Sequence, residues 1–328
     1  MNWISEGPSI IAWLALAIAF VALARAADSF VDSASAVAAR LHIPHLVIGI
    51  VLVSLATTTP ELAVSVTSAL KGNPEMALGN AVGSVICNCG LALALCGLFS
   101  RRPVPVAPHV LKTTGGVLLG VAILLFLFIR RDNTLTRGEG LILMAILAAY
   151  LGFLFVQHRS GRHRDTFPLK DPQPPAQRPL PFHLAVFAVA LTVIIVASQF
   201  IVVSAVTIAQ RLGIPEATIA LTLVAFGTSI PDVATSITAA IKGHGALSVG
   251  NILGANIMNI CWVAGASAVA APLSLQRRET AFIFPSMFVL VAVTLVVLHT
   301  GHQLSRREGA ILLSLYVAYL AAFVTIFA

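Results

Sequence analysis

Two acidic residues, Glu61 and Asp232, lie within long apolar stretches of the sequence. Of the thirteen acidic residues, they are the only ones placed well inside such stretches. A carboxylate is costly inside a bilayer, by a few kcal/mol even on insertion scales. Two of them therefore indicate a functional site, and a buried structural hydrogen bond is the alternative interpretation.

Each of these acids directly follows a proline, Pro60 or Pro231. Proline inside a helix removes one backbone N–H and displaces the carbonyl four residues earlier, which here belongs to Ala56 or Gly227. Inside a bilayer a freed carbonyl needs water, a neighbouring helix or a cation as its partner. The sequence predicts a helix break beside each proline, with both carbonyls as candidate cation ligands; a simple kink is the alternative.

Side chains with oxygen atoms accompany both acids at helical spacing. Carboxylate, carbonyl, hydroxyl and amide oxygens suit Ca²⁺ or Na⁺ rather than Zn²⁺ or Cu⁺, which prefer His or Cys ligands. One divalent or two monovalent cations would neutralise the two carboxylates, so one species excludes the other, and protonation would also discharge the pair. The further candidate ligands are Thr57, Thr58, Ser84, Asn88, Thr228, Ser229 and Asn259.

Some of the polar and small residues nearby have a structural interpretation. A single Ser or Thr in a membrane helix commonly bonds to its own backbone. Asn80 and Asn251 either bind the cation or hold broken backbone in place. Glycines spaced four residues apart predict close helix packing. They are Gly79, Gly83, Gly250 and Gly254.

The two acids occupy equivalent positions in an internal repeat. Residues 41–90 align without gaps with residues 212–261, a shift of 171, and nineteen of the fifty pairs are identical. If each copy belongs to a five-span half, the second half enters the membrane from the other side. The sequence therefore predicts two inverted-topology repeats that face each other near the midplane, where such folds bind their substrates.

Composition and hydropathy predict the elements that position these residues. The chain is 58% apolar and 10% charged, against roughly 25% charged in soluble domains. This balance excludes a soluble enzyme, a nucleic-acid binder and a disordered chain. Its 328 residues suit about ten spans of ~20 residues, all of them helices. The predicted spans are 8–27, 43–70, 76–99, 110–129, 138–156, 181–210, 215–241, 245–275, 280–300 and 308–328.

The chain divides into residues 1–157, the first five-helix repeat, and residues 182–328, the second. The segment 158–181 between them is basic and rich in proline, and we predict a cytoplasmic linker, with a regulatory site as the alternative. Basic residues number thirteen on one set of connections and seven on the other. The richer side should be cytoplasmic, which places both termini outside the cytoplasm. The four cysteines fall in apolar stretches and should be buried and inert.

The paired segments resemble the two α-repeats of the cation/calcium exchanger superfamily, which includes the sodium/calcium exchangers. They read ATTTPELAVSVTSALKGN…GNAVGSVICN and FGTSIPDVATSITAAIKG…GNILGANIMN, within repeats at about 43–99 and 214–270. The resemblance implies an all-α integral membrane protein of ten transmembrane helices in two inverted halves. It also implies that the second and third helices of each half form the site, and that the helices at 8–27 and 181–210 slide to alternate access.

By position, the resemblance assigns Glu61 and Asp232 to calcium, and the hydroxyl and amide candidates to sodium or its path. The sequence departs from the family at Asp232, where many relatives have Glu. It also departs at Asn88 and Asn259, because several relatives have an acid at one of these positions.

Together these observations predict a secondary active antiporter that exchanges Ca²⁺ for Na⁺, not an enzyme, with no cofactor. Coupling to H⁺ or K⁺ is one alternative, and a passive cation channel or a cation sensor is another. A membrane hydrolase is disfavoured because the sequence has no H-E-x-x-H and no G-x-S-x-G. The expected partners are membrane lipid and inorganic cations, without nucleic acid, and a monomer is compatible with the sequence. We expect a prokaryotic plasma (inner) membrane.

Overall fold

The computed structural model describes residues 9–41, 43–159, 178–212 and 216–327, and it is nearly all helical. Eight of the described helices are long and apolar enough to cross a membrane, or nine spans if the bent pair His45–Thr57 and Thr59–Leu70 counts as one. The α-helices are α2 (Ser9–Leu41), α3 (His45–Ile48), α4 (Ser54–Thr57), α5 (Thr59–Leu70), α6 (Pro74–Cys87), α7 (Leu93–Phe99), α8 (Pro108–Val110), α9 (Gly116–Asp132), α10 (Arg137–Arg159), α11 (Leu180–Arg211), α12 (Glu216–Ile241), α13 (Gly245–Met258), α14 (Gly265–Ala270), α15 (Arg277–His299) and α16 (Arg306–Phe327). The π-helical segments are η1 (Gly49–Val53), η2 (Asn88–Ala92), η3 (Leu111–Gly115) and η4 (Asn259–Ala264), and η5 (Thr300–His302) is a 3₁₀ turn.

Over the residues that the structure describes, the predicted spans coincide with helical segments, with two differences in their limits. Helix α2 continues to Leu41, beyond the predicted end at residue 27, because residues 28–41 contain no Pro or Gly and bury apolar residues such as Phe30 and Val31. The span predicted at 245–275 ends at Ala270 and is followed by a short strand. The predicted linker 158–181 lies largely outside the described residues.

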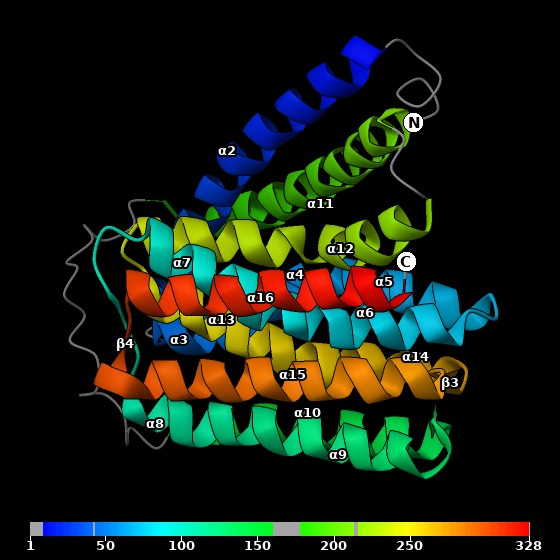
Figure 1. Ribbon diagram of the computed structural model, residues 1–328. Coiled ribbons are helices and arrows are strands. Elements are labelled where there is room, and N and C mark those ends of the chain that lie inside the picture. The colour runs from blue at the N-terminus through cyan, green and yellow to red at the C-terminus, as the bar shows by residue number, and fades with distance from the viewer. Residues whose placement is uncertain (1–8, 42, 160–177, 213–215, 328) are drawn as a thin grey trace.

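Helices α2 and α11 form a pair that leans away from the remaining helices (Figure 1). The two helices pack along each other, and the rings of Phe30 and Phe187 stack with their centroids 4.3 Å apart. Buried apolar side chains of this pair belong to a cluster that is separate from the main core and also includes bundle residues such as Ile48, Val53 and Ile230. The pair thus packs as a unit that meets the bundle along α12 and along the bent span His45–Leu70.

Two short antiparallel ladders connect the two halves of the chain. Strand β1 (Val104–Pro105) pairs with β4 (Gln303–Leu304), and β2 (Thr134–Leu135) pairs with β3 (Leu273–Ser274). Figure 1 shows β4 and β3 at opposite ends of the bundle. Each ladder therefore joins a first-half strand to a second-half strand, one ladder at each end. No signal in the sequence predicts these strands.

Helix α13 packs closely against the bent span His45–Leu70 because both backbones carry glycine at the contact. A Cβ added to Gly250 would lie 2.7 Å from the carbonyl oxygen of Leu46, and one added to Gly254 would lie 2.7 Å from that of Ile50. The predicted close packing is confirmed at both positions. A Cβ on Gly79 would meet open space, so the equivalent glycine of the first half does not have this role.

Candidate cation site

Glu61 on α5 and Asp232 on α12 are fully buried, each with 0% of its surface exposed. They are near enough for their charges to interact unfavourably. The structure therefore brings together the two acids that the sequence places 171 residues apart.

Among the described residues, three of the four carboxylate oxygens of these acids have no hydrogen-bond donor. Asn88 Nδ2 donates to Asp232 Oδ2 over 2.9 Å. Within the described part of the chain, Asp232 Oδ1, both carboxylate oxygens of Glu61 and Asn88 Oδ1 have no hydrogen-bond partner, and neither does either amide atom of Asn259. An unpartnered buried carboxylate is costly in free energy. This group of oxygens therefore requires cations, protons or water.

The hydroxyl groups predicted as ligands lie between the two halves. Ser229 Oγ donates to Ser84 Oγ over 3.0 Å, and Ser229 neighbours Glu61 of the other half. Thr57 neighbours Asp232 in the same crossed manner, while donating to the carbonyl of Val53 over 2.9 Å. Each acid is thus accompanied by a hydroxyl from the opposite half.

Two of the predicted hydroxyls point elsewhere. Thr58 Oγ1 donates to the carbonyl of Ser54 over 2.7 Å, which is the local bonding expected of a threonine in a membrane helix. Thr228 Oγ1 donates to Asn80 Oδ1 over 2.8 Å. Both hydroxyl groups donate their protons to protein acceptors, and they would have to rotate to change these partners.

Asn80 holds the backbone next to the first acid. Its amide nitrogen donates to the carbonyl of Glu61 over 3.3 Å and to Ser65 Oγ over 2.9 Å. Its amide oxygen accepts the hydroxyl of Thr228 from the other half. Asn80 therefore fixes the helix that carries Glu61 and also ties it to the opposite repeat.

Asn251 repeats this arrangement 171 residues later. It donates to the carbonyl of Asp232 over 3.5 Å and to Ser236 Oγ over 2.8 Å. It also accepts from Thr57 Oγ1 at 3.4 Å. Of the two interpretations that the sequence allows, these bonds favour backbone clamps. Asn80 and Asn251 are not among the predicted ligands. The repeat aligns them with each other, and this match was the signal that they share a role.

The backbone responds differently to the two prolines. The helical span His45–Leu70 is interrupted at Thr58, two residues before Pro60, and bends by 43°, whereas α12 continues through Pro231. The predicted break is therefore present beside Pro60, and the prediction of an interruption at Pro231 is wrong. Threonines 57–59 each donate a hydroxyl to a carbonyl four residues earlier, which bends helices. Ile230 takes the place of the third threonine in α12.

The carbonyls of Ala56 and Gly227, one turn before the two prolines, stay predicted ligands. Gly227 lies against the helix pair, because a Cβ added there would be 2.4 Å from Val202 Cγ2 of α11.

Two π-helical segments begin at the site. Segment η2 begins at Asn88, and η4 begins at Asn259, its equivalent in the second half. Single π-helical turns inside α-helices are frequent at functional sites. The sequence predicts polar residues here but not the change from α-helix to π-helix, because the spacing of apolar residues is similar in the two helix types.

The donor atoms are those of a hard cation site. They are carboxylate, amide and hydroxyl oxygens, the ligands that Ca²⁺ and Na⁺ take. The described residues contain no group of three or more His, Cys, Asp or Glu side chains arranged to hold a metal ion. The four cysteines are buried and unpaired, as expected from their apolar surroundings. The donor set therefore does not resemble a site for a thiolate- or imidazole-binding metal.

Apolar helices long enough to cross a bilayer, with two opposed acids buried between them, define an integral membrane protein with an acidic interior site. The model of the family described as sodium/calcium exchanger protein matches residues 11–156 and 182–325. The chain belongs to this family.

Individual relatives agree with this assignment over nearly their whole length. The sodium/calcium exchanger MaX1 of Methanosarcina acetivorans is 30% identical over 341 residues, covering 94% of this chain and 97% of the relative. The inner membrane protein YrbG of Escherichia coli is 31% identical over 317 residues, covering 95% and 96%. A solved structure of the sodium-calcium exchanger NCX_Mj superposes with a TM-score of 0.79 at 25% identity, covering 96% of this chain and 99% of that one.

Proposed function

We propose that this protein is a secondary active antiporter that exchanges Ca²⁺ for Na⁺ at the site between Glu61 and Asp232. The observation that carries the proposal is the set of unpartnered oxygens on two opposed buried acids. A divalent cation bound there would neutralise both charges, and Na⁺ ions would do the same. Because both cations would use the same charges, occupancy by one excludes the other, which is the basis of exchange.

The two acids are the proposed calcium ligands, assisted by the Ala56 and Gly227 carbonyls. The hydroxyl and amide side chains around them are proposed to bind sodium or line its path. Asn88 and Asn259 keep unpartnered amide oxygens, so each has an acceptor available for a cation. The remaining proposed residues are Thr57, Thr58, Ser84, Thr228 and Ser229.

Alternating access is proposed to use two inverted five-helix halves, residues 1–157 and 182–328. Matching hydrogen bonds of Asn80 and Asn251 support this symmetry. So do the two ladders, because the pairing of β1 with β4 is repeated by the equivalent strands β3 and β2 at the opposite end of the bundle. The sliding elements are proposed to be α2 and α11, since they form a packing unit of their own.

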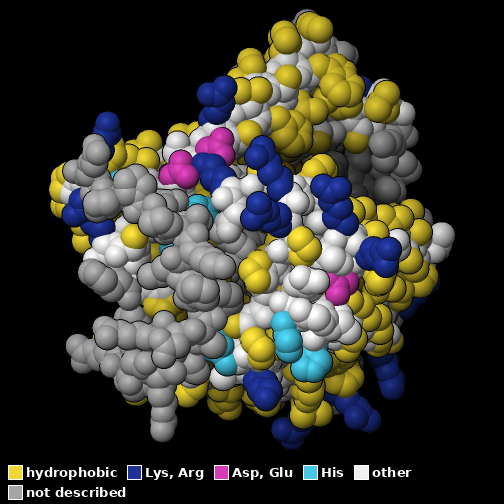
Figure 2. Space-filling view, turned by 90° about the vertical axis from the view of Figure 1, so that its left-hand side faces the viewer, with side chains coloured by type: hydrophobic (Ala, Val, Ile, Leu, Met, Phe, Trp, Pro, Cys, Tyr) yellow, Lys and Arg dark blue, Asp and Glu magenta, His cyan; other side chains and the backbone are white. Residues whose placement is uncertain are grey.

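The proposed orientation places the β1–β4 end of the bundle in the cytoplasm. Figure 2 views that end and shows many Lys and Arg side chains on it, as the positive-inside rule expects. Both termini then lie outside the cytoplasm. We place the protein, as a monomer, in a prokaryotic plasma membrane, supported by the bacterial and archaeal sources of its relatives.

The test is calcium uptake by purified protein in vesicles. Sodium-loaded vesicles placed in sodium-free buffer with radioactive Ca²⁺ should accumulate it, and Glu61→Gln should abolish the uptake. Glu75→Gln is the matched control, because Glu75 is an exposed acid in the first turn of α6. Absence of sodium-dependent uptake in the wild type, or full uptake by Glu61→Gln, would contradict the proposal.

Coupling to H⁺ or K⁺ is the second candidate, because amides rather than acids stand at Asn88 and Asn259 and the described residues place no third carboxylate with Glu61 and Asp232. Uptake measured while Na⁺, K⁺ and pH are varied one at a time separates these couplings. A calcium flux that does not depend on Na⁺, K⁺ or pH would instead favour a passive channel.

A further inference from the structure

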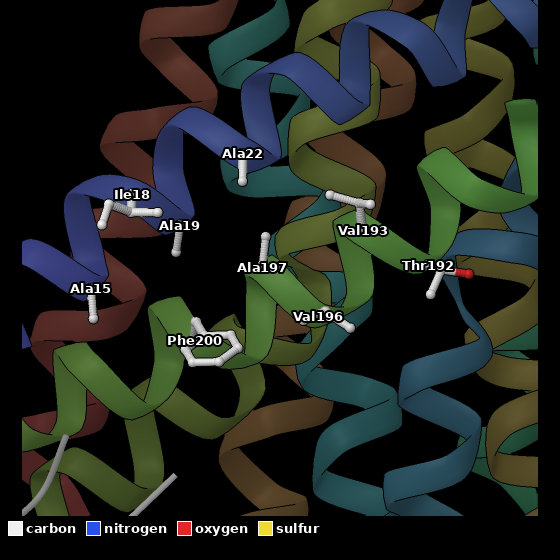
Figure 3. A pocket seen from close by; sticks show the side chains of 9 residues that line it. All are labelled: Ala15, Ile18, Ala19, Ala22, Thr192, Val193, Val196, Ala197 and Phe200. Atoms are coloured by element: carbon white, nitrogen blue, oxygen red, sulfur yellow. The ribbon is translucent and has the colours of Figure 1, made fainter. Parts of the chain in front are cut away.

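An apolar groove lies between α2 and α11, on the helix pair that leans away from the bundle. It encloses about 440 Å³. Ala15, Ala19 and Ala22 form its α2 wall, and Val193, Val196 and Phe200 contribute to its α11 wall (Figure 3). Thr192 is the only residue with a side-chain hydroxyl among those lining it, and this hydroxyl donates to the carbonyl of Ala188 over 2.9 Å. The groove therefore offers apolar contact and no free polar group.

The groove exists because α2 presents small side chains to α11 between two points where the helices are in contact. The three alanines follow one face of α2 at helical spacing. On one side of them, Phe30 stacks on Phe187. On the other side, Ala12 and Ala15 pack with Ile208. The helices cannot close over the alanines without disturbing these two contacts.

The groove opens toward the bilayer. Ile18 at its edge is 68% exposed and Val196 is 46% exposed, on helices apolar enough to cross a membrane. A hollow of this size is far larger than the ~150 Å³ apolar cavity that binds benzene. In a membrane the molecules that meet such a surface are lipids, whose acyl chains match its chemistry.

A positive charge marks one end of the same hollow. A second hollow shares Ile18 and Ala22 with the groove and continues along α2 to Arg25. Arg25 is exposed, ends an uncharged run of eighteen residues (7–24), and forms no ion pair within the described chain. The nearest acids on α2, Asp28 and Asp32, are both paired with Lys242. An arginine placed at the end of an apolar run lies at head-group depth, where it attracts anionic lipid.

We propose that this groove binds an anionic phospholipid, with one acyl chain between α2 and α11 and the phosphate on Arg25. The binding site stands on this geometry alone. Its consequence rests on the proposed function, because α2 and α11 are the helices proposed to slide. A lipid wedged between them would alter the rate of exchange without touching the cation site.

Binding is measured first, independently of transport. The wild type is purified with phosphatidylcholine and phosphatidylglycerol, and retained lipid is counted by native mass spectrometry. Arg25→Gln removes the head-group contact, and Ala22→Leu fills the groove. Each should lower the amount of retained phosphatidylglycerol roughly fivefold. For Arg25→Gln this is the effect of one interfacial charge, and for Ala22→Leu it is the loss of the space for the acyl chain. Arg102→Gln and Ala145→Leu, both at exposed positions outside the groove, are the matched controls.

Calcium exchange is then compared in vesicles of phosphatidylcholine alone and of phosphatidylcholine with phosphatidylglycerol. The wild type should respond to phosphatidylglycerol, and both groove variants should lose the response. Thermal unfolding of every variant confirms that it is folded. Equal retention of phosphatidylglycerol by the groove variants, or equal loss in the controls, would overturn the site. Lipid retention without any calcium exchange would instead refute the proposed function and leave the lipid site standing.

Discussion

The two halves of the chain make matching hydrogen bonds to the backbone of their acids, but the carboxylates of the two acids have different hydrogen-bond partners. In both halves an asparagine bonds the acid's carbonyl and a serine four residues later. Asp232 also receives an amide donor from Asn88. Glu61 receives no such bond, and the equivalent donor, Asn259, has no partner among the described residues.

This difference shows that a duplicated site need not work symmetrically. The longer acid, Glu61, follows a helix interruption and has both oxygens free of protein donors. The shorter acid, Asp232, lies in a continuous helix and is oriented by Asn88. We therefore expect Asp232 to be the fixed side of the proposed site, and Glu61 to be the side chain that moves toward a cation. Four changes break or sharpen this comparison.

Removing either charge should have the largest effect. A contact between opposite charges near 4 Å is worth about 4 kcal/mol at an effective dielectric constant of 20, so Glu61→Gln and Asp232→Asn should each weaken Ca²⁺ binding by on the order of 1,000-fold. The halves should differ in stability without Ca²⁺. Glu61→Gln removes an unpartnered charge and should raise the unfolding temperature, whereas Asp232→Asn gives up a charged hydrogen bond and should raise it less.

Calorimetry with Ca²⁺ and thermal unfolding in chelator measure these two effects, with Glu75→Gln as control. Equal shifts of the unfolding temperature in both variants would contradict the division into a fixed and a movable acid.

Removing the clamps should have the next largest effect, and here the halves should agree. Asn80→Ala and Asn251→Ala each leave buried partners unsatisfied, at a cost of about 1–3 kcal/mol. Calcium affinity should fall roughly tenfold in each, which corresponds to about 1.4 kcal/mol. Calorimetry on both variants tests this. A large loss in only one of them would mean that the matching bonds do not have matching functions.

The sequence was sufficient to single out the two acids that the structure buries near each other. Glu61 and Asp232 stood out because charge is expensive in lipid, and their equivalence followed from the repeat. The long apolar helices of the described chain followed from hydropathy. These features depend on local composition or on comparing the chain with itself, so no three-dimensional information was needed.

The asymmetry could not be predicted, because it arises from tertiary contacts. Nothing in the sequence says that Asn88 faces Asp232 of the other half while Asn259 bonds neither acid. Pro231 looks like Pro60 in the sequence, yet only the helix before Pro60 carries three threonines bonded to their own backbone. The extension of α2 to Leu41 likewise depends on packing, since its second part is too polar to read as a membrane span.

Removing the donor to Asp232 should matter more than removing its counterpart. A hydrogen bond to a charged group contributes about 1.5–3 kcal/mol, so Asn88→Ala should lower the free energy of unfolding in chelator by an amount of this order. Asn259→Ala removes an amide without partners and should leave it unchanged or raise it. Both should weaken cation binding if the amide oxygens are ligands. Chemical unfolding of the two variants decides whether the difference between the halves is energetic.

The smallest effect should come from the two equivalent lysines that follow the acid-bearing helices. Lys242 pairs with Asp28 and Asp32 of α2 at 3.3 and 2.8 Å. Lys71 has no ion pair within the described chain, and the shift of 171 places Gln199 and Val203 where α2 has its acids. Only one end of the bundle is therefore tied to α2 by charge.

Exposed ion pairs contribute up to about 1 kcal/mol, so Lys242→Gln should change the initial rate of calcium exchange by at most roughly fivefold, and Lys71→Gln should not change it. High salt should reduce the difference between wild type and Lys242→Gln, because salt screens an exposed pair. Initial rates in vesicles at low and high ionic strength measure this. If both lysine variants behave alike, the pair does not restrain α2, and the asymmetry is confined to the cation site.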